Sequence, residues 1–244
     1  MLQILVGPTE HSKPFFVHHS LITSRSRFFA NALKHYDGDA AGKFHWLEGE
    51  EGIVKLPADE PAIFANYIQL LYQGCIPTRA QINGNSTLLP AEELNAAISL
   101  AVNKEYEDLA KLYVLCEKLQ DSDSKAAIIT AFVQASLARR ENGRSYSPNV
   151  SATRLIYDGT MACDPLRDFC VDSFVILANE HWVKGLTAEH YHPEYVFDVM
   201  VAMTRDRPRP ADRTRLKNAE RYCRKLLSSE VKVVGAKGDE AKGE

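Results

Sequence analysis

The stretch Phe16–Phe29, FVHHSLITSRSRFF, passes from one backbone pattern to another within a few residues. It begins inside the run KPFFVH at 13–18, which predicts a strand. From Ser20 onward the pattern is helical, and Ser26 is a candidate N-cap because its hydroxyl can accept from the free amides of a first helical turn. The residues after it place four apolar side chains on one helical face: Phe28, Phe29, Ala32 and Leu33. The stretch therefore predicts a strand followed by a helical hairpin.

Short strands and one strong helix flank this stretch. Leu2–Val6 alternates apolar and other residues before Gly7, which predicts the strand that pairs with 13–18. Residues 53–56 predict another strand, stopped by a proline. A helix is predicted from Pro61, which suits a first turn, to Gly74, which suits a helix end. Its apolar stripe consists of Ile63, Phe64, Tyr67, Ile68, Leu71 and Tyr72.

Apolar stripes predict further helices along the rest of the chain. The expected segments are 90–104, 109–119, one capped by Ser122 or Asp123, one capped by Ser151, one opened by Asp164 and Pro165, one opened by Pro193, and 210–227. In the helix from Pro193 the expected inward residues are Val196, Phe197, Met200 and Met203.

Three segments carry a resemblance to a known family. Phe16–Phe29 resembles the F-x-V-H-K-x-L-L-x-x-x-S-x-x-F-F signature of the BTB/POZ domain, with His19 where the family usually has lysine. Val54–Ile76 is similar to the family's V-x-L-P-x-D-x-P-x-x-F segment and the Y-x-x-x-L-Y-x-G-x-I that follows it. Leu112–Asp121 resembles its L-Y-x-L-A-E-K-L-x-D helix. The three segments occur in the family's order.

The resemblance implies an α+β fold in which a small mixed sheet is capped by helices. We expect this BTB/POZ-like domain to cover residues 1–140, with 79–105 as an insertion. Residues 149–227 resemble the helical C-terminal extension of fungal-type BTB proteins, and we expect this all-helical region to pack against the first domain. The polar segment 141–148 is the expected boundary, and a frayed tail is expected at 228–244.

The function that the resemblance implies is protein–protein interaction. BTB domains join with themselves or with other BTB proteins, and many act as adaptors that bring a substrate to a cullin-type ubiquitin ligase. Many dimeric members have a helix and a strand before the first core strand, whereas this sequence begins almost at that strand. We therefore expect a monomer, or a dimer formed through a different surface.

Composition limits the class of protein. The chain has 244 residues, of which 45% are hydrophobic and 25% charged, as in an ordinary globular protein. No apolar run approaches the about 18 residues that a membrane helix needs, so we expect no membrane association. The odd number of cysteines, five, and the lack of a secretory pattern at the first residues favour the cytoplasm or the nucleus.

Catalysis lacks a positive signal in the sequence. No phosphate-binding, dinucleotide-binding, nucleophile-elbow or zinc-protease motif is present, so we expect no enzyme, no cofactor and no small-molecule substrate. His18 is expected to hold the strand-to-helix corner by donating to a backbone carbonyl. A zinc site or thiol chemistry is an alternative, but the spacing fits no established pattern and favours a solvated loop. That alternative would use His181, His190, His192, Cys163 and Cys170.

A basic segment lies near the end of a chain whose net charge is −3. Its cations are Arg205, Arg207, Arg209, Arg213, Arg215, Lys217, Arg221, Arg224 and Lys225. One interpretation is a nuclear regulator of chromatin or transcription that uses this patch. We favour a solvated helix face, and no nucleic-acid partner, because no aromatic residues are interleaved with the cations.

A second candidate surface is the first strand. If Leu2–Val6 is an edge strand, its free backbone groups can pair with another chain. The candidate interface residues are then Leu2, Ile4 and Val6.

Overall fold

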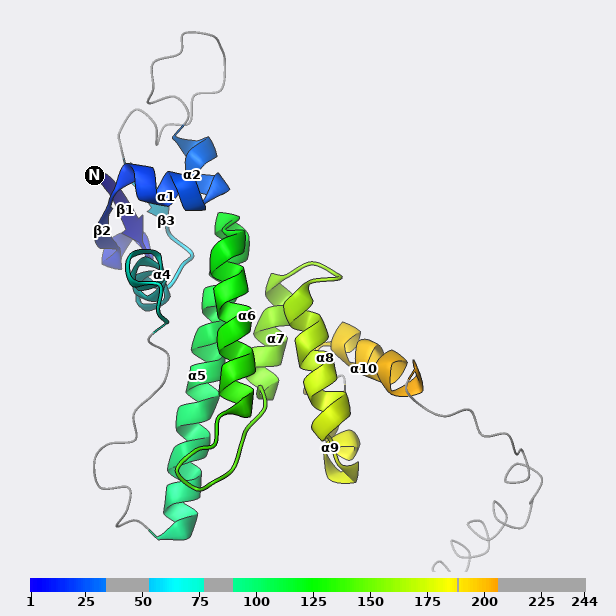
Figure 1. Ribbon diagram of the computed structural model, residues 1–244. Helices are drawn as coiled ribbons and strands as arrows, with labels where there is room; N and C mark the ends of the chain where they lie inside the picture. Colours follow the sequence, from blue (N-terminus) through cyan, green and yellow to red (C-terminus); the bar gives the residue numbers. More distant parts are fainter. Residues whose placement is uncertain (34–52, 77–89, 188, 206–244) are drawn as a thin grey trace, which may run out of the picture. The chain divides into compact units, whose positions relative to one another are not determined.

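The computed structural model of the 244-residue chain describes residues 1–33, 53–76, 90–187 and 189–205, and Figure 1 shows the order of their elements. The fold is α+β, with a small sheet near the N-terminus and helices over the remainder of the described chain. Residues 1–203 form one compact unit. The predicted 210–227 helix, the 228–244 tail and residues 79–89 of the expected insertion lie outside the described residues.

The sheet has three strands, β1 (Leu2–Val6), β2 (Lys13–Val17) and β3 (Ile53–Leu56), in the order β2-β1-β3. A short 3-10 helix, Thr9–His11, connects β1 to β2. These two strands are antiparallel, whereas β3 runs parallel to β1 and pairs Ile53 with Gln3. β1 is therefore the central strand, and its apolar side chains enter the core.

Ser26 is the cap that the sequence predicts, and it joins two short helices, α1 (His19–Arg25) and α2 (Arg27–Ala32). Its hydroxyl oxygen accepts from the backbone N–H of Phe29 at 3.2 Å and donates to the carbonyl of Leu119 at 2.6 Å. The same side chain thus starts α2 and fixes the corner to a helix more than ninety residues further along the chain.

Helix α4 (Pro61–Gln73) has the predicted boundaries, and Gly74 ends it with the left-handed φ of 66°. The ring of Phe64 lies edge-on to Phe15 of β2, with centroids 5.0 Å apart. The expectation that His18 bonds to a backbone carbonyl is wrong, because its ring Nδ1 lies 2.6 Å from the Tyr72 hydroxyl oxygen. The backbone N–H of His18 donates to the same oxygen at 3.0 Å. This pairing ties the strand-to-helix corner to the end of α4.

Two long helices, α5 (Ala91–Leu119) and α6 (Ser122–Leu137), lie side by side (Figure 1). Residues 90–104 and 109–119 are predicted as separate helices, but the structure joins them into α5, so an insertion boundary at 105 falls inside one helix. Ile98, Val102 and Tyr106 are buried, so the buried face of α5 continues from the first predicted helix into the second.

A buried aspartate joins the sheet region to this helix pair. Asp121, fully buried, caps α6 by accepting from the backbone N–H of Ser124 at 2.9 Å, where the sequence suggests Ser122 or Asp123. It also accepts from the hydroxyl of Tyr67 on α4 at 3.1 Å, and the Arg25 guanidinium lies 3.5 Å away. One carboxylate thus connects α1, α4 and α6.

The C-terminal half is helical, as expected: α7 (Val150–Gly159), α8 (Pro165–Leu177), α9 (Glu180–Gly185) and α10 (Pro193–Arg205). Helix α7 packs on α5. The intervening connection is anchored on α5 as well, because Arg140 forms a buried ion pair with Glu105 at 2.9 Å and the Tyr106 hydroxyl donates to the carbonyl of Tyr146 at 2.8 Å. The expected boundary at 141–148 is therefore a packed crossing and not a gap between cores.

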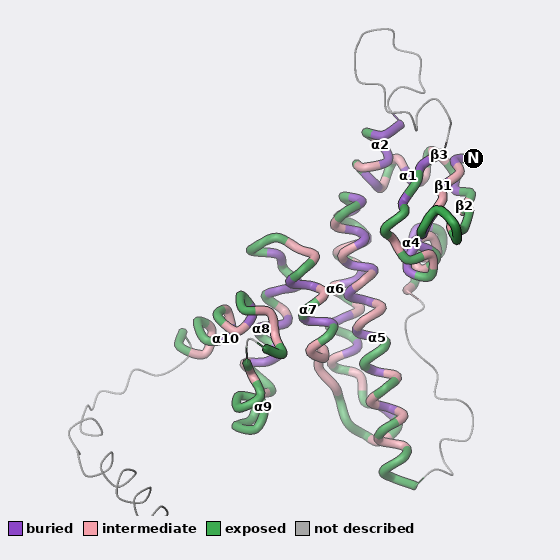
Figure 2. Tube along the Cα trace, turned by 180° about the vertical axis from the view of Figure 1, so that it is seen from behind, coloured by how far each residue is buried: buried purple, intermediate pink, exposed green. Residues whose placement is uncertain are grey.

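The inward face of α10 differs from the predicted one. Tyr195 and Val199 are buried, whereas Phe197 and Met200 are exposed at 66% and 58%. Apolar residues occupy both sides of this helix, so the spacing alone does not select the buried side. Figure 2 shows how much of α9 and α10 is exposed. Within the described residues, no helix is both long enough and apolar enough to span a membrane.

Candidate functional site

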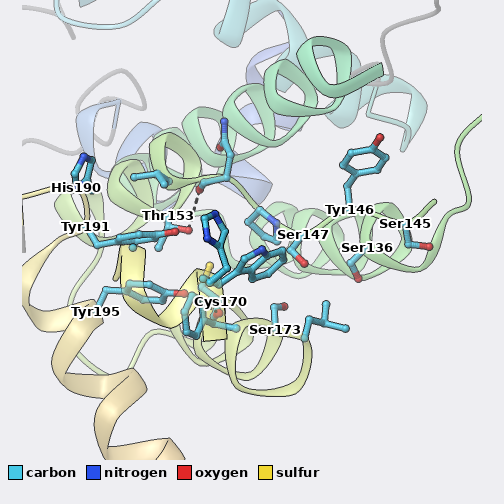
Figure 3. A pocket seen from close by; sticks show the side chains of 18 of the residues that line it. Ser136, Ser145, Tyr146, Ser147, Thr153, Cys170, Ser173, His190, Tyr191 and Tyr195 are labelled. Atoms are coloured by element: carbon cyan, nitrogen blue, oxygen red, sulfur yellow. Dashed lines mark hydrogen bonds between the residues drawn. The ribbon is translucent and has the colours of Figure 1, made fainter. Parts of the chain in front are cut away.

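An aromatic groove of about 1140 Å³ lies in the C-terminal half (Figure 3). We define it by the end of α6, the connection from Arg139 to Val150, α8, α9 and the segment from His190 to Tyr195. Figure 3 shows Tyr191 and Tyr195 on one side, Ser136, Ser145 and Tyr146 on the other, and Thr153, Cys170 and Ser173 between them.

Aromatic rings form a continuous wall of the groove. Tyr191 stacks on Tyr195 with ring centroids 5.3 Å apart, and Tyr195 lies edge-on to Phe174 at 6.2 Å. Phe174 in turn lies 6.2 Å from Trp182, whose side chain is exposed at the groove's edge. Such rings offer flat apolar faces to a bound molecule, and the hydroxyl and indole N–H groups add hydrogen-bonding capacity.

The end of this wall is held by its own polar contacts. The Tyr195 hydroxyl approaches the carbonyl of Cys170 at 3.4 Å. Behind Tyr195, the ring of Tyr157 lies edge-on at 5.3 Å, and its hydroxyl donates to Asp198 of α10 at 2.9 Å. Burial, followed by the hydrogen bond and charge of Asp198, raises the pKa of Tyr157 above its ordinary value, so the phenol keeps its role as the donor in this hydrogen bond.

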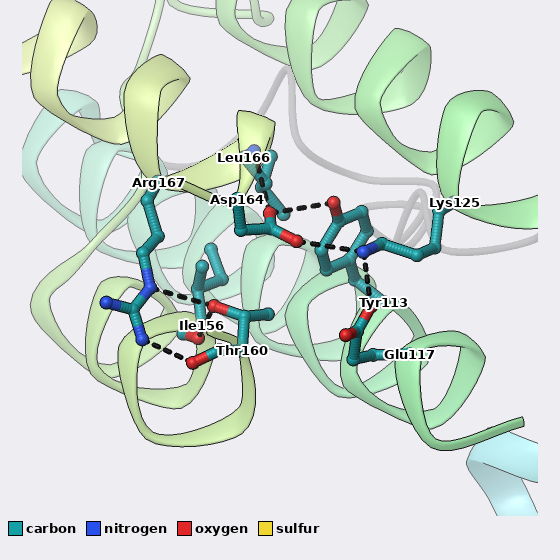
Figure 4. Close-up of polar contacts among 8 residues, drawn as sticks. All are labelled: Tyr113, Glu117, Lys125, Ile156, Thr160, Asp164, Leu166 and Arg167. Carbon is teal, nitrogen blue, oxygen red and sulfur yellow. Dashed lines mark hydrogen bonds and ion pairs between the residues drawn. The ribbon is translucent and has the colours of Figure 1, made fainter. Parts of the chain in front are cut away.

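Arg167 fastens α10 to the end of α7 (Figure 4 shows its contact with Thr160). It is buried, donates from Nε to the Thr160 hydroxyl at 2.9 Å and from Nη2 to the carbonyl of Tyr157 at 2.8 Å. Nη1 donates to Glu194 at 2.7 Å, and the guanidinium lies 4.4 Å from the Tyr157 ring centroid. A planar, permanently charged group with several donors suits this position better than lysine would.

A second buried aspartate joins α5, α6 and α8 (Figure 4). Asp164 caps α8 through the backbone N–H of Leu166 at 2.9 Å, as the sequence predicts, and accepts from the Tyr113 hydroxyl at 2.8 Å. Lys125 donates to Asp164 at 2.8 Å and also contacts Glu117. Burial by itself lowers the pKa of Lys125, but the hydrogen bonds and charges of the two carboxylates outweigh it and raise that pKa. These contacts hold the helix that carries Cys170, Ser173 and Phe174.

The ionisable residues of the groove lining are arginine, histidine, tyrosine and cysteine. Arg139, His181 and His190 line it, and no aspartate or glutamate does so among the described residues. His190 Nδ1 lies 2.9 Å from the Thr187 hydroxyl. The lining thus presents the Arg139 cation together with imidazole, hydroxyl and indole groups to whatever enters.

Cys170 lines the groove as a buried thiol. It is buried, and burial raises its pKa to about 12, so it stays neutral at physiological pH. Within the described residues, neither Cys170 nor a serine of the groove is hydrogen-bonded to His181 or His190. The arrangement suits binding through aromatic faces, hydroxyls and the Arg139 cation.

The predicted edge strand is wrong. Leu2, Ile4 and Val6 are at most 4% exposed, and β1 is paired on both sides, with β2 and with β3. The sequence predicts the three short strands, but it does not predict their order in the sheet. That order depends on β3, which lies fifty residues further along the chain and pairs with the second side of β1. The edges of the sheet are β2 and β3, so β1 offers no free backbone groups.

The basic patch falls almost entirely outside the described residues. Arg205 is exposed at the end of α10. The other members, Arg207, Arg209, Arg213, Arg215, Lys217, Arg221, Arg224 and Lys225, lie beyond the described part of the chain.

The residues of the alternative zinc site are dispersed. His181 and His190 line the groove, whereas His192 Nδ1 accepts from the backbone N–H of Glu194 at 3.2 Å. Cys163 is exposed and Cys170 is buried. Across the described ranges, no three metal-binding side chains of the histidine, cysteine or carboxylate type come together.

Sequence reasoning missed the groove itself. Trp182 lies on α9, a helix of only six residues that apolar periodicity does not reveal. The sequence signal that could have indicated α9 is the N-cap residue Asn179 followed by the acidic Glu180. In the structure the Asn179 side chain accepts from the backbone N–H of Trp182 at 3.1 Å. Tyr191 precedes α10 and Tyr195 lies in its first turn.

Comparison with known proteins adds no assignment: neither the family models nor the curated proteins gave a match to this chain.

Proposed function

We propose that this chain is a non-enzymatic protein–protein interaction module with a BTB/POZ-like N-terminal domain. The proposal is supported by the positions that carry the resemblance, which perform structural tasks in the fold. Val17, Ile22 and Phe29 are buried, and Ser26 joins α2 to α5. A mixed sheet whose third strand returns parallel to the first, followed by helices, agrees with the small capped sheet that the resemblance implies.

The observation that carries the proposal is the exposed apolar surface of the helical half. Leu137, Leu177 and Trp182 are exposed at 74%, 53% and 41% around the groove. A separate set on α10, which we call the α10 face, consists of Phe197, Met200 and Val201. Large apolar side chains that gather on a surface mark protein contacts more often than single exposed ones do.

The adaptor form of the proposal is tested directly with a cullin. The purified chain is mixed with purified cullin N-terminal fragments, and complex formation is followed by sedimentation velocity at tens-of-micromolar concentration, which corresponds to about 6–7 kcal/mol. A complex of defined stoichiometry supports the adaptor. If every fragment sediments separately, the cullin adaptor is abandoned, and the wider interaction proposal then depends on the next experiment.

The wider proposal is tested on the α10 face. Immobilised wild-type chain is compared, in extract from the source organism, with a Phe197→Asp, Met200→Asp double variant. Arg154→Asp, an exposed change on α7, serves as the control. We expect one set of proteins on the wild type and the control, and its loss from the double variant, with the same thermal unfolding for all three. Identical captured proteins on all three chains would contradict a role for this face.

A further inference from the structure

The aromatic groove combines three features that point to one kind of occupant. Its wall is a chain of aromatic rings from Tyr191 to Trp182. Its edge carries exposed Leu137 and Leu177. Its only ionisable lining residues that can hold a positive charge are Arg139, His181 and His190 within the described chain, and no carboxylate lines it.

The exposed apolar edge of the groove favours a segment of polypeptide over a small molecule. The groove measures about 1140 Å³, close to the upper end of the about 300–1,000 Å³ of sites that bury most of a small ligand. Here the apolar side chains at the edge remain half or more exposed, so a compact ligand seated among the rings would leave them in water. A chain segment lying along the groove can cover both the rings and the edge.

The charge of the groove lining favours an acidic segment over a basic one. Arg139 is exposed and makes no ion pair with the described residues. The neighbouring carboxylate on α9, Glu180, is already paired with Lys184 at 2.8 Å. An acidic side chain in the groove would therefore meet the Arg139 cation without a competing carboxylate in the lining, whereas a basic one would meet like charge.

We propose that the aromatic groove binds a segment of a partner protein in which apolar side chains alternate with acidic ones. This inference rests on the proposed function, because it names the chemistry of the partner that the module recognises. The apolar side chains would pack on Phe174, Trp182 and Tyr191, and a carboxylate would pair with Arg139.

The test is a binding measurement on the purified full-length chain. The probes are a fluorescein-labelled peptide in which leucine and phenylalanine alternate with glutamate, and a counterpart in which lysine replaces glutamate. Fluorescence anisotropy gives the affinity of each. We expect binding of the glutamate peptide that weakens with added salt, and at least about tenfold weaker binding of the lysine peptide, since like charges in an interface cost more than about 1.4 kcal/mol.

Two variants locate the binding in the groove. Arg139→Glu replaces the proposed ion pair between Arg139 and a carboxylate of the peptide by a repulsion between two carboxylates. We expect about tenfold weaker binding of the glutamate peptide. Trp182→Ala removes an aromatic contact, and we expect a loss of about tenfold or more. Arg154→Glu is the matched control, because Arg154 is an exposed arginine that does not line the groove, and it is expected to bind like the wild type.

Several outcomes overturn the inference. Equal affinity for both peptides removes charge selection, and equal losses in Arg139→Glu and Arg154→Glu show a general charge effect. If neither peptide binds, and the anionic dye anilinonaphthalene sulfonate binds the wild type but not Trp182→Ala, the groove is a small-molecule site. The proposed interaction function survives these results if the α10 face or a cullin fragment still forms its complex. Failure of the groove inference can therefore be distinguished from failure of the proposed function.

Discussion

Gly159, the last residue of α7, lies against Val114 of α5 so closely that a Cβ on it would come within 2.5 Å of the valine Cγ1 and 3.0 Å of its Cβ. No other described glycine has a side-chain neighbour this close. The two helices therefore meet at a point where only glycine fits, and this contact seats the C-terminal half on the long helix α5.

Gly159→Ala is expected to destabilise the chain by about 1–3 kcal/mol, because the added methyl group must displace Val114. Chemical denaturation measures the loss in free energy of unfolding. Gly185→Ala is the control, since Gly185 also ends a helix but its Cβ would meet nothing within 4 Å. Val114→Ala in the Gly159→Ala background is expected to recover part of the loss, and additive effects would contradict the close contact.

Asp164→Asn is expected to lower the free energy of unfolding by about 1.5–3 kcal/mol, the range for hydrogen bonds to charged groups. Asparagine caps helices as well as aspartate does, so the change removes charge and leaves the cap of α8 in place. Asp172→Asn, at an exposed position of the same helix, is expected to change stability by less than about 0.5 kcal/mol. Equal effects of the two variants in thermal and chemical unfolding would show that the charge of Asp164 contributes nothing.

Lys125 makes part of the stability depend on alkaline pH. Its folded pKa is raised above the ordinary 10.5, so its contribution is fully present below 10.5 and is lost as the pH rises through the raised folded value. The difference in free energy of unfolding between wild type and Lys125→Met should therefore shrink with rising pH. Buried tyrosines such as Tyr113 also reduce alkaline stability, but they do so in both proteins. A difference that stays constant or grows with pH would rule out this account of Lys125.

The cysteines are expected to differ sharply in alkylation. Cys75 and Cys163 are exposed and should react with iodoacetamide in the folded chain. Cys116 and Cys170 are buried, and burial raises both pKa values, that of Cys170 to about 12. They should react only after unfolding, including at pH values where a free thiol ionises. Peptide mass spectrometry after timed labelling measures each site, and rapid labelling of Cys170 in the folded chain would show that the groove opens to the reagent.

Local signals in the sequence predicted much of the local structure. The strand at Leu2–Val6, the cap at Ser26, the helix from Pro61 to Gly74 and the cap at Asp164 are all confirmed. Each depends on neighbouring residues alone, since a cap or a turn is determined within a few positions of the chain.

Features that depend on distant partners were not predicted. β1 is central because residues 53–56 pair with it, and α10 buries Tyr195 and not Phe197 because of what α7 and α8 present to it. The groove needs side chains from segments up to about sixty residues apart, and no local pattern brings Leu137 and Tyr195 together. The positions of the Asp121 and Asp164 contacts likewise follow from helix packing.

The placement of β1 also affects the order in which the chain can fold. The β1–β2 hairpin can form once Val17 has been made, but the other side of β1 waits for Ile53 to close a loop of fifty residues. Contacts so far apart in sequence slow folding, and until they form, a nascent chain carries an unpaired strand edge on which two copies can aggregate. Slow refolding at low protein concentration, and aggregation in competition with it at high concentration, would be the kinetic sign of that delay.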